Sequence, residues 1–451
     1  MPALSGYDLA IYPGRFNTPS SLPIHFRVQI DGLAFSVYKI TINNLHTNLC
    51  RKVQCMKKNI SLAGILLILV LCAAGCSRNA DSNLVLVKEY EGGFLYKAGP
   101  VSVLELRGTH YEMGRQYGML LKDELAALYD LAVARYGDYK ITPARMLAVA
   151  SAYYANFPPK YKDVIAGMAQ TSGLGIDRQI VINGIEIIQK INGIVPAGNC
   201  TGLVVWGDYT GGAPLIFGRS NDDHPFFRHF GGYTVVTVFN LTDGGIPTAI
   251  VNYAGAIYAP TAFNRHGIFM EINSGNSGGG FRLDRTPTVV SMFELLQSCS
   301  TMAQVDAAFQ NVAVDISSIV NVSDLNGAYS YEISLSAMKR RSAGGEGLLA
   351  STNHFLDPSW GIDPPTPDKD AENGWTVARL TNGLNWAYAQ KGQADVYAMK
   401  DILSKEIAAE KGLCSANTIY QVIAVPQTFT VWLRAPGYFE WQVIDLKGLF
   451  H

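Results

Sequence analysis

Cys200 is the residue whose neighbours in the sequence best support covalent chemistry. It precedes the apolar run Thr201–Trp206, and the run Pro214–Gly218 follows a Gly-Asp-Tyr-Thr-Gly-Gly turn, so the two runs predict a β-hairpin. The antiparallel register of that hairpin places Cys200 beside Arg219, with Asp222 just past the strand end. A cation near a thiol favours the thiolate, and a carboxylate can orient a base. The spacing therefore indicates a nucleophile, although most buried cysteines are inert.

The other cysteines separate an N-terminal region from a body. Four of the 7 cysteines lie between residues 50 and 76, and only Cys200, Cys299 and Cys414 stand in the rest of the chain. No Cys-x-x-Cys pair occurs there, which excludes zinc sites built on paired cysteines and a disulfide-dense scaffold. We expect Cys299 and Cys414 to be structural.

The composition is that of a globular protein without a nucleic-acid footprint. Lys and Arg number 36 against 37 Asp and Glu, which gives a net charge of −1 without long blocks of one sign. Nucleic acid is not an expected partner, because tracking phosphates needs a basic surface. Charged residues are 16% and apolar residues 48%, which excludes disorder over most of the chain.

Residues 56–75 have the pattern of a secretory signal peptide. Met56-Lys57-Lys58 supplies the positive start, Ile60–Ala74 is apolar, and small residues precede Cys76. The apolar run is shorter than the ~20 residues that cross a bilayer. Ala73-Ala74-Gly75-Cys76 resembles a bacterial lipobox, in which the cysteine is lipidated. A plain signal peptide that is cut nearby is the alternative.

Residues 1–55 show no clear hydrophobic period. We interpret them as a non-native or disordered extension ahead of Met56, the expected initiator. The alternative is a genuine extension followed by an internal membrane anchor.

The body combines a helical block with strand-rich segments. One strand is predicted at residues 101–106, and the chain from there to about Ile191 is predicted to be mostly helical. Within it, Tyr161, Val164, Ile165 and Met168 form one apolar helix face. After Asn199 the pattern predicts two hairpins, at 201–218 and 233–251. Further helices are predicted at 291–298, 302–310, 378–388 and 399–410, and strands at 418–425, 428–433 and 439–446. Antiparallel strands around helical blocks indicate an α+β layered domain.

The segment around Cys200 resembles the nucleophile hairpin of a known family. Asn199-Cys200-Thr201, followed by Gly218-Arg219-Ser220-Asn221-Asp222, is similar to that of the isopenicillin-N acyltransferase-like N-terminal-nucleophile hydrolases. Choloylglycine hydrolases and acid ceramidases are more distant relatives. The family usually has Asn where Ser220 stands, and an aromatic residue often stands where Asp223 does.

Other segments match the family in the same order over roughly residues 101–446. They are the prosegment motif Gly108–Gly118, Phe263–Gly267 with Asn273 downstream, Ser351-Thr352-Asn353-His354-Phe355, and Arg379. The ordered set is more specific than any single motif.

The resemblance implies a four-layer αββα N-terminal nucleophile hydrolase sandwich with a helical N-terminal prosegment. An inactive precursor would cut itself between Asn199 and Cys200. Residues 76–199 would become a helical subunit and residues 200–451 the catalytic subunit of a heterodimer. The freed α-amine, whose ordinary pKa is near ~8, would be the base that the thiol needs.

The resemblance also implies roles for individual side chains. Cys200 would attack an amide carbonyl, while Asn273 and a backbone N–H would hold the oxyanion. Asp222 would orient the α-amine, Arg219 would lie against the nucleophile, and Arg379 would stabilise the site or bind a polar substrate group. The simpler alternatives are a structural Arg219–Asp222 ion pair and a solvated Arg379.

Three alternative sites are weaker. Asn353 and His354 are expected near the substrate, but His354 could instead be a papain-like base for Cys200, although no papain-type signature surrounds that cysteine. Gly275–Gly279 matches the serine-hydrolase pattern G-x-S-x-G, yet a loop rather than a helix follows it. Asp222-Asp223-His224 could bind a metal, but no ligand cluster supports this, so neither a metal nor a cofactor is expected.

The leading hypothesis is an exported, self-processing cysteine amidase or acyltransferase that cleaves linear amide C–N bonds of N-acyl substrates through an acyl-thioester on Cys200. We expect an apolar acyl group, since the family favours one, and hydrolysis over transfer. The alternatives are an ester or phospholipase-type hydrolase on the same fold and an inactive ligand-binding lipoprotein. The lipobox predicts a bacterial cell envelope location, with a lipid on Cys76 in the membrane and the protein facing the periplasm or the exterior.

Overall fold

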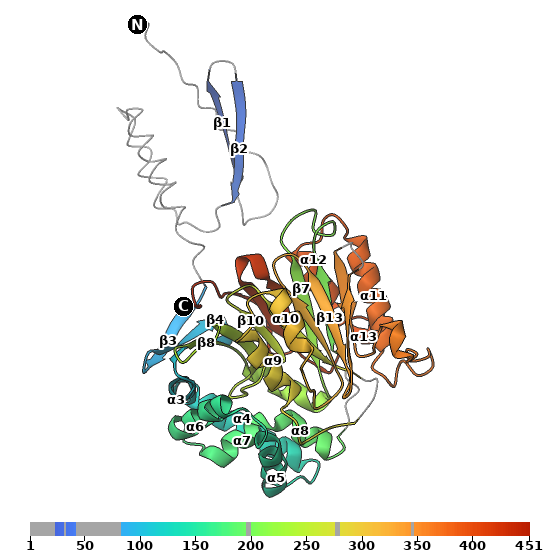
Figure 1. Ribbon diagram of the computed structural model, residues 1–451. Helices are drawn as coiled ribbons and strands as arrows, with labels where there is room; N and C mark the ends of the chain where they lie inside the picture. The colour runs from blue at the N-terminus through green and yellow to red at the C-terminus, as the bar shows by residue number, and fades with distance from the viewer. Residues whose placement is uncertain (1–22, 31–32, 42–82, 195–199, 276–279, 344–346) are drawn as a thin grey trace, which may run out of the picture. The chain divides into compact units, whose positions relative to one another are not determined.

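The computed structural model describes residues 23–30, 33–41 and 83–451, apart from 195–199, 276–279 and 344–346 (Figure 1). The chain divides into two compact units, Met1–Asp81 and Ser82–His451. In the first unit, strands β1 (Pro23–Ile30) and β2 (Leu33–Thr41) pair antiparallel. The expected signal segment 56–75 and Cys76 lie outside the described residues. No helix in the described part of the chain has the length and apolar character needed to cross a membrane.

Two β-sheets form the centre of the second unit. The first has ten strands, in the order β14 (Met338–Ser342), β13 (Ala328–Ile333), β12 (Ser318–Ser323), β11 (Phe269–Ser274), β10 (Thr261–Asn264), β9 (Thr248–Tyr253), β8 (Thr234–Leu241), β5 (Val101–Gly108), β4 (Gly93–Ala98) and β3 (Val85–Tyr90). The second has six strands, in the order β15 (Leu348–Ser351), β6 (Thr201–Val205), β7 (Ile216–Asp222), β16 (Thr418–Val425), β17 (Thr430–Ala435) and β18 (Phe439–Asp445).

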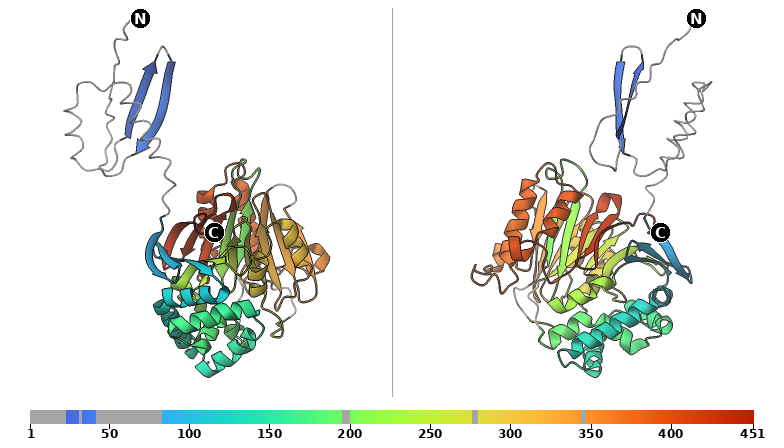
Figure 2. Two further views of the ribbon diagram at one scale, coloured as in Figure 1. Left: turned by 60° about the vertical axis from the view of Figure 1, so that its left-hand side comes forward. Right: turned by 180° about the vertical axis from the view of Figure 1, so that it is seen from behind.

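Helices cover the outer faces of both sheets, which confirms the predicted four-layer αββα sandwich (Figure 2). The sheets contact each other through β6 and β11, β13 and β15, and β4 and β18. On the first sheet α9 (Thr288–Leu296) packs against β10, and α10 (Met302–Phe309) follows it. On the second sheet lie α11 (Thr376–Ala389) and α12 (Val396–Ser404), followed by the short α13 (Ile407–Glu410). Short 3-10 helices span Pro225–Tyr233, Pro358–Trp360 and Pro426–Thr428.

The N-terminal part of this unit is helical, as predicted, but it also supplies strands to the first sheet. Its helices are α3 (His110–Leu120), α4 (Lys122–Gly137), α5 (Pro143–Tyr154), α6 (Pro159–Ser172), α7 (Ile176–Asn183) and α8 (Ile185–Ile191). The apolar face predicted on α6 is buried. Strands β3, β4 and β5 precede them, and β5 pairs with β8 in parallel. Residues before and after position 199 are therefore joined in one sheet.

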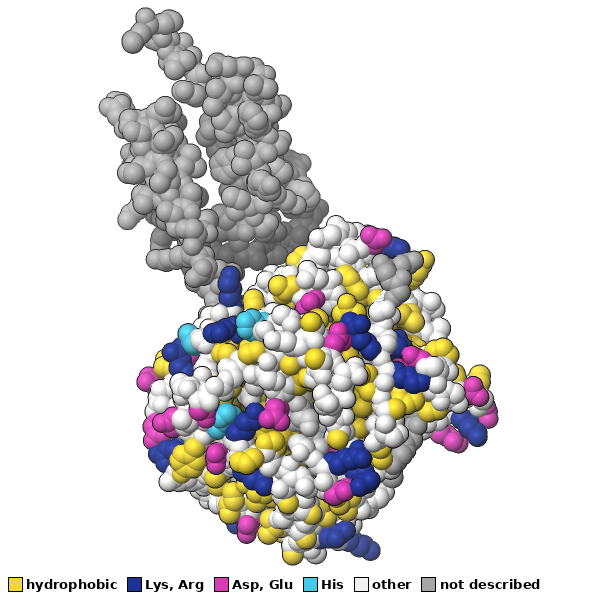
Figure 3. All heavy atoms as spheres, in the orientation of Figure 1, with side chains coloured by type: hydrophobic (Ala, Val, Ile, Leu, Met, Phe, Trp, Pro, Cys, Tyr) yellow, Lys and Arg dark blue, Asp and Glu magenta, His cyan; other side chains and the backbone are white. Residues whose placement is uncertain are grey.

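The strands that position Cys200 are buried along their whole length. Every residue of β6, β7 and β16 is buried, because the other sheet covers one face and α11 and α12 cover the other. The sequence of Thr418–Val425 is accordingly mostly apolar, with Gln421 as a polar exception. One core joins the two sheets to the N-terminal helices, and a second lies between β6, β7 and the outer helices. On the face shown in Figure 3, basic and acidic side chains are interspersed.

Candidate functional site

Cys200 stands directly before β6, but the hairpin register differs from the predicted one. Gly202 pairs with Arg219 and Thr201 with Ser220, so continuing the ladder brings Cys200 opposite Asn221 rather than Arg219. The prediction was wrong because the connection between β6 and β7 is longer than the predicted Gly-Asp-Tyr-Thr-Gly-Gly turn. Bonds from the Gly212 N–H to the Gly207 carbonyl and from the Ala213 N–H to the Thr210 carbonyl hold these residues in turns outside the ladder.

The Cys200 thiol is buried and hydrogen-bonded to the end of β7. It is 6% exposed, and its Sγ lies 3.2 Å from the Asp222 carbonyl oxygen and 3.8 Å from Asn221 Oδ1. Burial raises the pKa of Cys200 to about 11, although the charge of Arg219 acts in the opposite direction. Arg219 therefore favours the thiolate, as expected, but burial outweighs it and the thiol stays protonated at neutral pH. The thiol needs a base to react at neutral pH.

Arg219 is paired with a residue that the sequence analysis missed. Its guanidinium forms a buried ion pair with Glu271 of β11 in the facing sheet, and it also donates to the Ile272 carbonyl at 2.9 Å. A further bond of 2.6 Å runs to Asn221 Oδ1. Burial alone would lower the pKa of Arg219, but Glu271 and the weaker charges of Tyr420, Cys200 and Asp222 together outweigh burial and raise that pKa. Arg219 thus fixes Asn221 beside the thiol.

The Asp222 side chain lies on the other face of β7 from Asn221. It is 3% exposed, and its Oδ1 accepts hydrogen bonds from Thr418 and from Ser415 Oγ at 3.3 Å. Its Oδ2 has no hydrogen-bond partner among the described residues. Burial raises the pKa of Asp222 to about 7. The Asp222 carboxyl group can therefore gain or lose a proton near neutral pH. It is not the partner of Arg219 in a simple ion pair, because Arg219 pairs with Glu271.

Arg379 joins Cys200 to Asn353. It is fully buried on α11, and its guanidinium donates to the Cys200 carbonyl at 2.8 Å, to Thr201 Oγ1 at 2.7 Å and to Asn353 Oδ1 at 2.8 Å. The amide of Asn353 in turn donates to the Ser274 carbonyl at 2.9 Å. Burial lowers the pKa of Arg379 to about 10, which leaves it charged at neutral pH. A solvated surface role is excluded.

Asn273 and His354 are not placed at the thiol. Asn273 is buried between the sheets, where its Nδ2 donates to Ser351 Oγ at 3.0 Å, and it does not line the cavity that contains Cys200. The Nδ1 of His354 lies 2.9 Å from Thr376 Oγ1 and 3.3 Å from Thr352 Oγ1. None of the described hydrogen bonds joins His354 to Cys200, so the geometry gives no support to a papain-like base. Burial lowers the pKa of His354 to about 4.

Several predicted features lie elsewhere. Asn199 and residues 276–279 of the G-x-S-x-G match are outside the described residues, and α9 begins only at Thr288. Cys299 and Cys414 are buried free thiols. Within the described ranges, no group of three or more His, Cys, Asp or Glu residues could hold a metal ion, Asp222-Asp223-His224 included.

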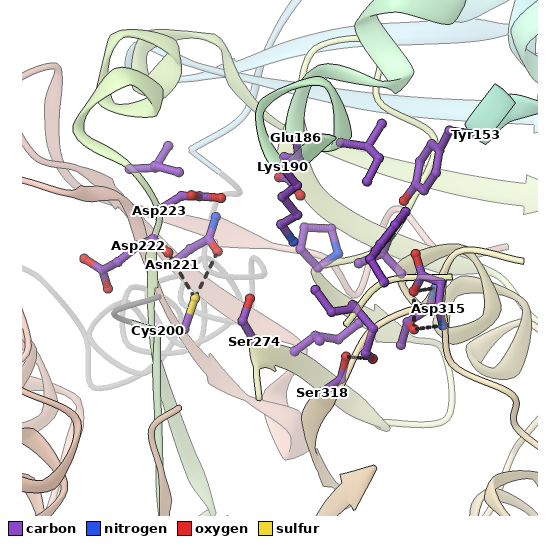
Figure 4. A pocket seen from close by; sticks show the side chains of 18 of the residues that line it. Tyr153, Glu186, Lys190, Cys200, Asn221, Asp222, Asp223, Ser274, Asp315 and Ser318 are labelled. Atoms are coloured by element: carbon purple, nitrogen blue, oxygen red, sulfur yellow. Dashed lines mark hydrogen bonds between the residues drawn. The ribbon is translucent and has the colours of Figure 1, made fainter. Parts of the chain in front are cut away.

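A small cavity of about 80 Å³ opens in front of Cys200 (Figure 4). Asn221, Asp222 and Asp223 line it on the side of the thiol, and Glu186 and Lys190 of α8 reach it from the N-terminal part of the unit. A cavity of this size holds water, and its walls come from both sides of position 199 in the sequence.

Comparisons with known proteins find remote likenesses among solved structures. No protein-family model and no curated protein matches the chain. Similar solved structures include the Caenorhabditis elegans ortholog of N-acylethanolamine-hydrolyzing acid amidase, 16% identical with a TM-score of 0.40 over 55% of this chain and 100% of that one. A conjugated bile acid hydrolase variant from Clostridium perfringens is 12% identical, with a TM-score of 0.39 over 55% and 93%. Penicillin V acylase from Agrobacterium tumefaciens is 10% identical, with a TM-score of 0.37 over 55% and 86%.

Proposed function

We propose that this chain is a self-processing N-terminal-nucleophile cysteine hydrolase that cleaves linear amide bonds of N-acyl substrates. The observation that carries the proposal is the position of Cys200. It lies directly before β6, an inner strand of an αββα sandwich, and its thiol faces a cavity, with Asn221 beside it and the buried Arg379 on its carbonyl. Among the described residues, no imidazole is bonded to this thiol. A base must therefore come from elsewhere.

Self-cleavage would supply that base. In the uncut chain the Cys200 nitrogen belongs to a peptide bond. The thiol would attack the Asn199 carbonyl, the C–N bond would break, and the acyl group would pass to sulfur while the nitrogen takes the proton. Water would then hydrolyse the thioester, which restores the thiol and leaves a free α-amine on Cys200. An amine with an ordinary pKa near ~8 is a suitable base for this thiol at neutral pH.

Substrate cleavage would repeat these steps on an external amide. The α-amine takes the Sγ proton while sulfur attacks the carbonyl carbon, and the leaving amine receives that proton as the C–N bond breaks. Water then hydrolyses the acyl-thioester. The family resemblance implies Asn273 as the side-chain donor to the oxyanion, and Asn353, which Arg379 holds next to the Cys200 main chain, is a second candidate. Neither of them lines the cavity formed by the described residues. One such donor is typically worth ~10²–10³ in rate.

The cellular setting is part of the same proposal. The signal-like segment 56–75 and the lipobox-like end at Cys76 support an exported protein anchored to a bacterial envelope by a lipid. The two pieces made by self-cleavage would remain together as a heterodimer. Hydrolysis is favoured over acyl transfer, because transfer needs a second binding site for the acceptor amine.

The proposal is tested by trapping the acyl-enzyme. Purified protein is incubated with N-acyl amides and quenched in acid, and its intact mass is measured by mass spectrometry. We expect the piece that begins with Cys200 to gain the mass of the acyl group. The adduct and the turnover should both vanish in Cys200→Ala and persist in Cys299→Ala, a matched change at another buried thiol. Equal turnover by Cys200→Ala would overturn the proposal.

A further inference from the structure

Strand β3 exposes three consecutive apolar side chains. Val85 is 64% exposed, Leu86 53% and Val87 56%, although successive residues of a strand point to opposite faces of the sheet. β3 is also an edge strand of the ten-stranded sheet, so one side of its backbone has no neighbouring strand among the described residues (Figure 1). The first half of β3 is therefore largely uncovered on both faces and along its outer edge.

The other exposed apolar residues have a different distribution. Within the described ranges the remaining large apolar residues that are exposed stand singly in the sequence, as Ile176 and Leu325 do. Scattered residues of this kind are normal on a protein surface. Adjacent ones on an open edge strand favour contact with another apolar surface, because such a strand otherwise promotes aggregation. The first half of β3 is thus a contact surface in search of an occupant.

The second half of β3 is polar and is attached to the folded unit. Lys88 Nζ donates to the carbonyl of Met119 in α3 at 2.8 Å. Glu91, directly after the strand, forms an ion pair of 2.6 Å with Arg115 of the same helix. Only the half of β3 that lies nearer to the N-terminus in the sequence therefore presents bare apolar side chains.

The sequence brings that half close to the expected lipid. Val85 is the ninth residue after Cys76, and nine residues span at most ~30 Å even when fully extended. Residues 77–83 are polar except for Ala80, so the first large apolar side chains after Cys76 are Leu84 and the three exposed ones of β3. A membrane that holds a lipid on Cys76 is therefore an apolar phase within reach of β3.

We propose that the first half of β3 contacts the surface of the bilayer in which Cys76 is anchored, with Val85, Leu86 and Val87 placed among the lipid headgroups. The inference rests on the lipid anchor of the proposed function and adds a second contact with the same membrane. Apolar side chains gain by leaving water, and the anchor keeps them at a high effective concentration near the bilayer. The contact stays at headgroup depth, because the unpaired backbone groups of the edge need water.

The test measures whether β3 contacts lipid. The Cys200→Ala chain is produced with its signal segment, purified with its lipid and reconstituted in vesicles of phosphatidylcholine and phosphatidylglycerol. The free thiols Cys299 and Cys414 are buried, so a polarity-sensitive fluorophore is attached at Leu86→Cys. Ile176→Cys, at the start of α7, is the matched control, since Ile176 is also an exposed apolar residue.

The two labels should respond differently. On vesicles we expect the label at position 86 to shift its emission to the blue and to be quenched several-fold more by brominated lipid than the label at position 176. Iodide in the water should quench the control label more. Equal responses would overturn the inference. Protection of position 86 from iodide without quenching by lipid would place a second copy of the chain on β3 and would overturn it too.

A variant tests the side chains themselves. Val85→Ser combined with Val87→Ser should lower the lipid quenching of the label at position 86 several-fold, because it removes the neighbouring apolar groups. Leu325→Ser, a change at an exposed residue in another part of the fold, should leave the quenching unchanged. Unchanged quenching in the double variant would show that these side chains do not hold β3 at the membrane and would overturn the inference.

Two further measurements separate this inference from the proposed function. Intact mass reports the lipid on Cys76, and trapping of the acyl-enzyme in the wild type reports amide cleavage. A lipidated chain whose label at position 86 stays in water overturns the inference alone. A label in lipid on a chain whose wild type cleaves no amide supports the inference and counts against the proposed hydrolase. A chain that carries no lipid and does not float with vesicles overturns the inference together with the anchor.

Discussion

The protonation states around Cys200 are set by burial. In the uncut chain the thiol is held protonated, Asp222 shares the same enclosed region with a raised pKa, and Arg219 keeps its charge through Glu271. The positive charges of Arg219 and Arg379 do not deprotonate the thiol by themselves. Repeated turnover of an external substrate therefore depends on a new base, and the α-amine released at Cys200 is the group that the proposal provides.

Replacing Asp222 should make the folded protein less sensitive to pH. The folded-state pKa of Asp222, about 7, exceeds its ordinary value near 4, so folding retains a proton that the unfolded chain releases. Its contribution is therefore present below about pH 4 and is lost as the pH rises through about 7. In a Cys200→Ala background, which keeps the chain whole, Asp222→Asn should gain stability relative to its parent over this range. The gain should reach at most ~4 kcal/mol.

Urea unfolding at about pH 4.5 and about pH 8 measures this difference. Asp130→Asn, which is exposed on α4, serves as the control and should show no such gain. If the stability of Asp222→Asn relative to its parent falls as the pH rises, the ionised form of Asp222 is favoured in the folded state and the assignment is wrong.

Some residues of the site could be predicted from the sequence, and others could not. Cys200, Arg219, Asp222 and Arg379 could be predicted because they stand in ordered motifs. Glu271 could not, because its contact with Arg219 crosses from one sheet to the other. A charged residue between apolar residues of the predicted sheet, Glu271 in the segment Phe269–Ser274, was the available signal.

At the scale of elements, the β6–β7 hairpin and β11 form one unit around the nucleophile. Gly202 pairs with Arg219 across the hairpin and faces Glu271 and Asn321 of the other sheet. A Cβ at this position would overlap Glu271 Oε1 and lie 2.7 Å from Asn321 Nδ2. The absence of a side chain at Gly202 therefore permits the buried Arg219–Glu271 pair.

Gly202→Ala should disturb that pair. In the Cys200→Ala background we expect a loss of about 1–3 kcal/mol in the free energy of unfolding, because the neighbouring atoms are enclosed and must shift. Gly137→Ala is the matched control, since an added Cβ at the end of α4 meets no atom within 4 Å. It should be neutral or stabilising by about 0.5 kcal/mol. Equal effects in urea unfolding would show that the contact across the sheets is unimportant.

The sequence also predicted some elements better than others. The long helices and the hairpins after Asn199 follow from local periodicity, and their predicted ranges agree with α9, α11, β8 and β16. The strands β3 and β4 were not predicted, and neither was the parallel pairing of β5 with β8. Pairing between strands that are distant in the chain depends on tertiary packing, which a local pattern does not specify.

At the scale of the whole folded unit, the bond before Cys200 connects two parts that share one sheet and one core. Strands β3, β4 and β5 come from the first part, and β8 to β14 from the second. Met113, Tyr117 and Val164 of the N-terminal helices belong to the core that also contains residues of both sheets. Cutting the chain before Cys200 would leave these contacts in place.

The two pieces should therefore stay associated after self-cleavage. On a sizing column without denaturant we expect a single peak that contains both pieces, and separation only in concentrated urea. The uncut Cys200→Ala chain is the control for elution volume. A folded, active piece that begins at Cys200 and elutes without the N-terminal piece would contradict the role of β5 in the shared sheet.

Intact mass and N-terminal sequencing of the purified wild-type protein, beside Cys200→Ala, test the central claim most directly. The account predicts two chains in the wild type, one of them beginning with Cys200, and a single chain in the variant. A wild type that is folded and remains one uncut chain would contradict the N-terminal-nucleophile mechanism.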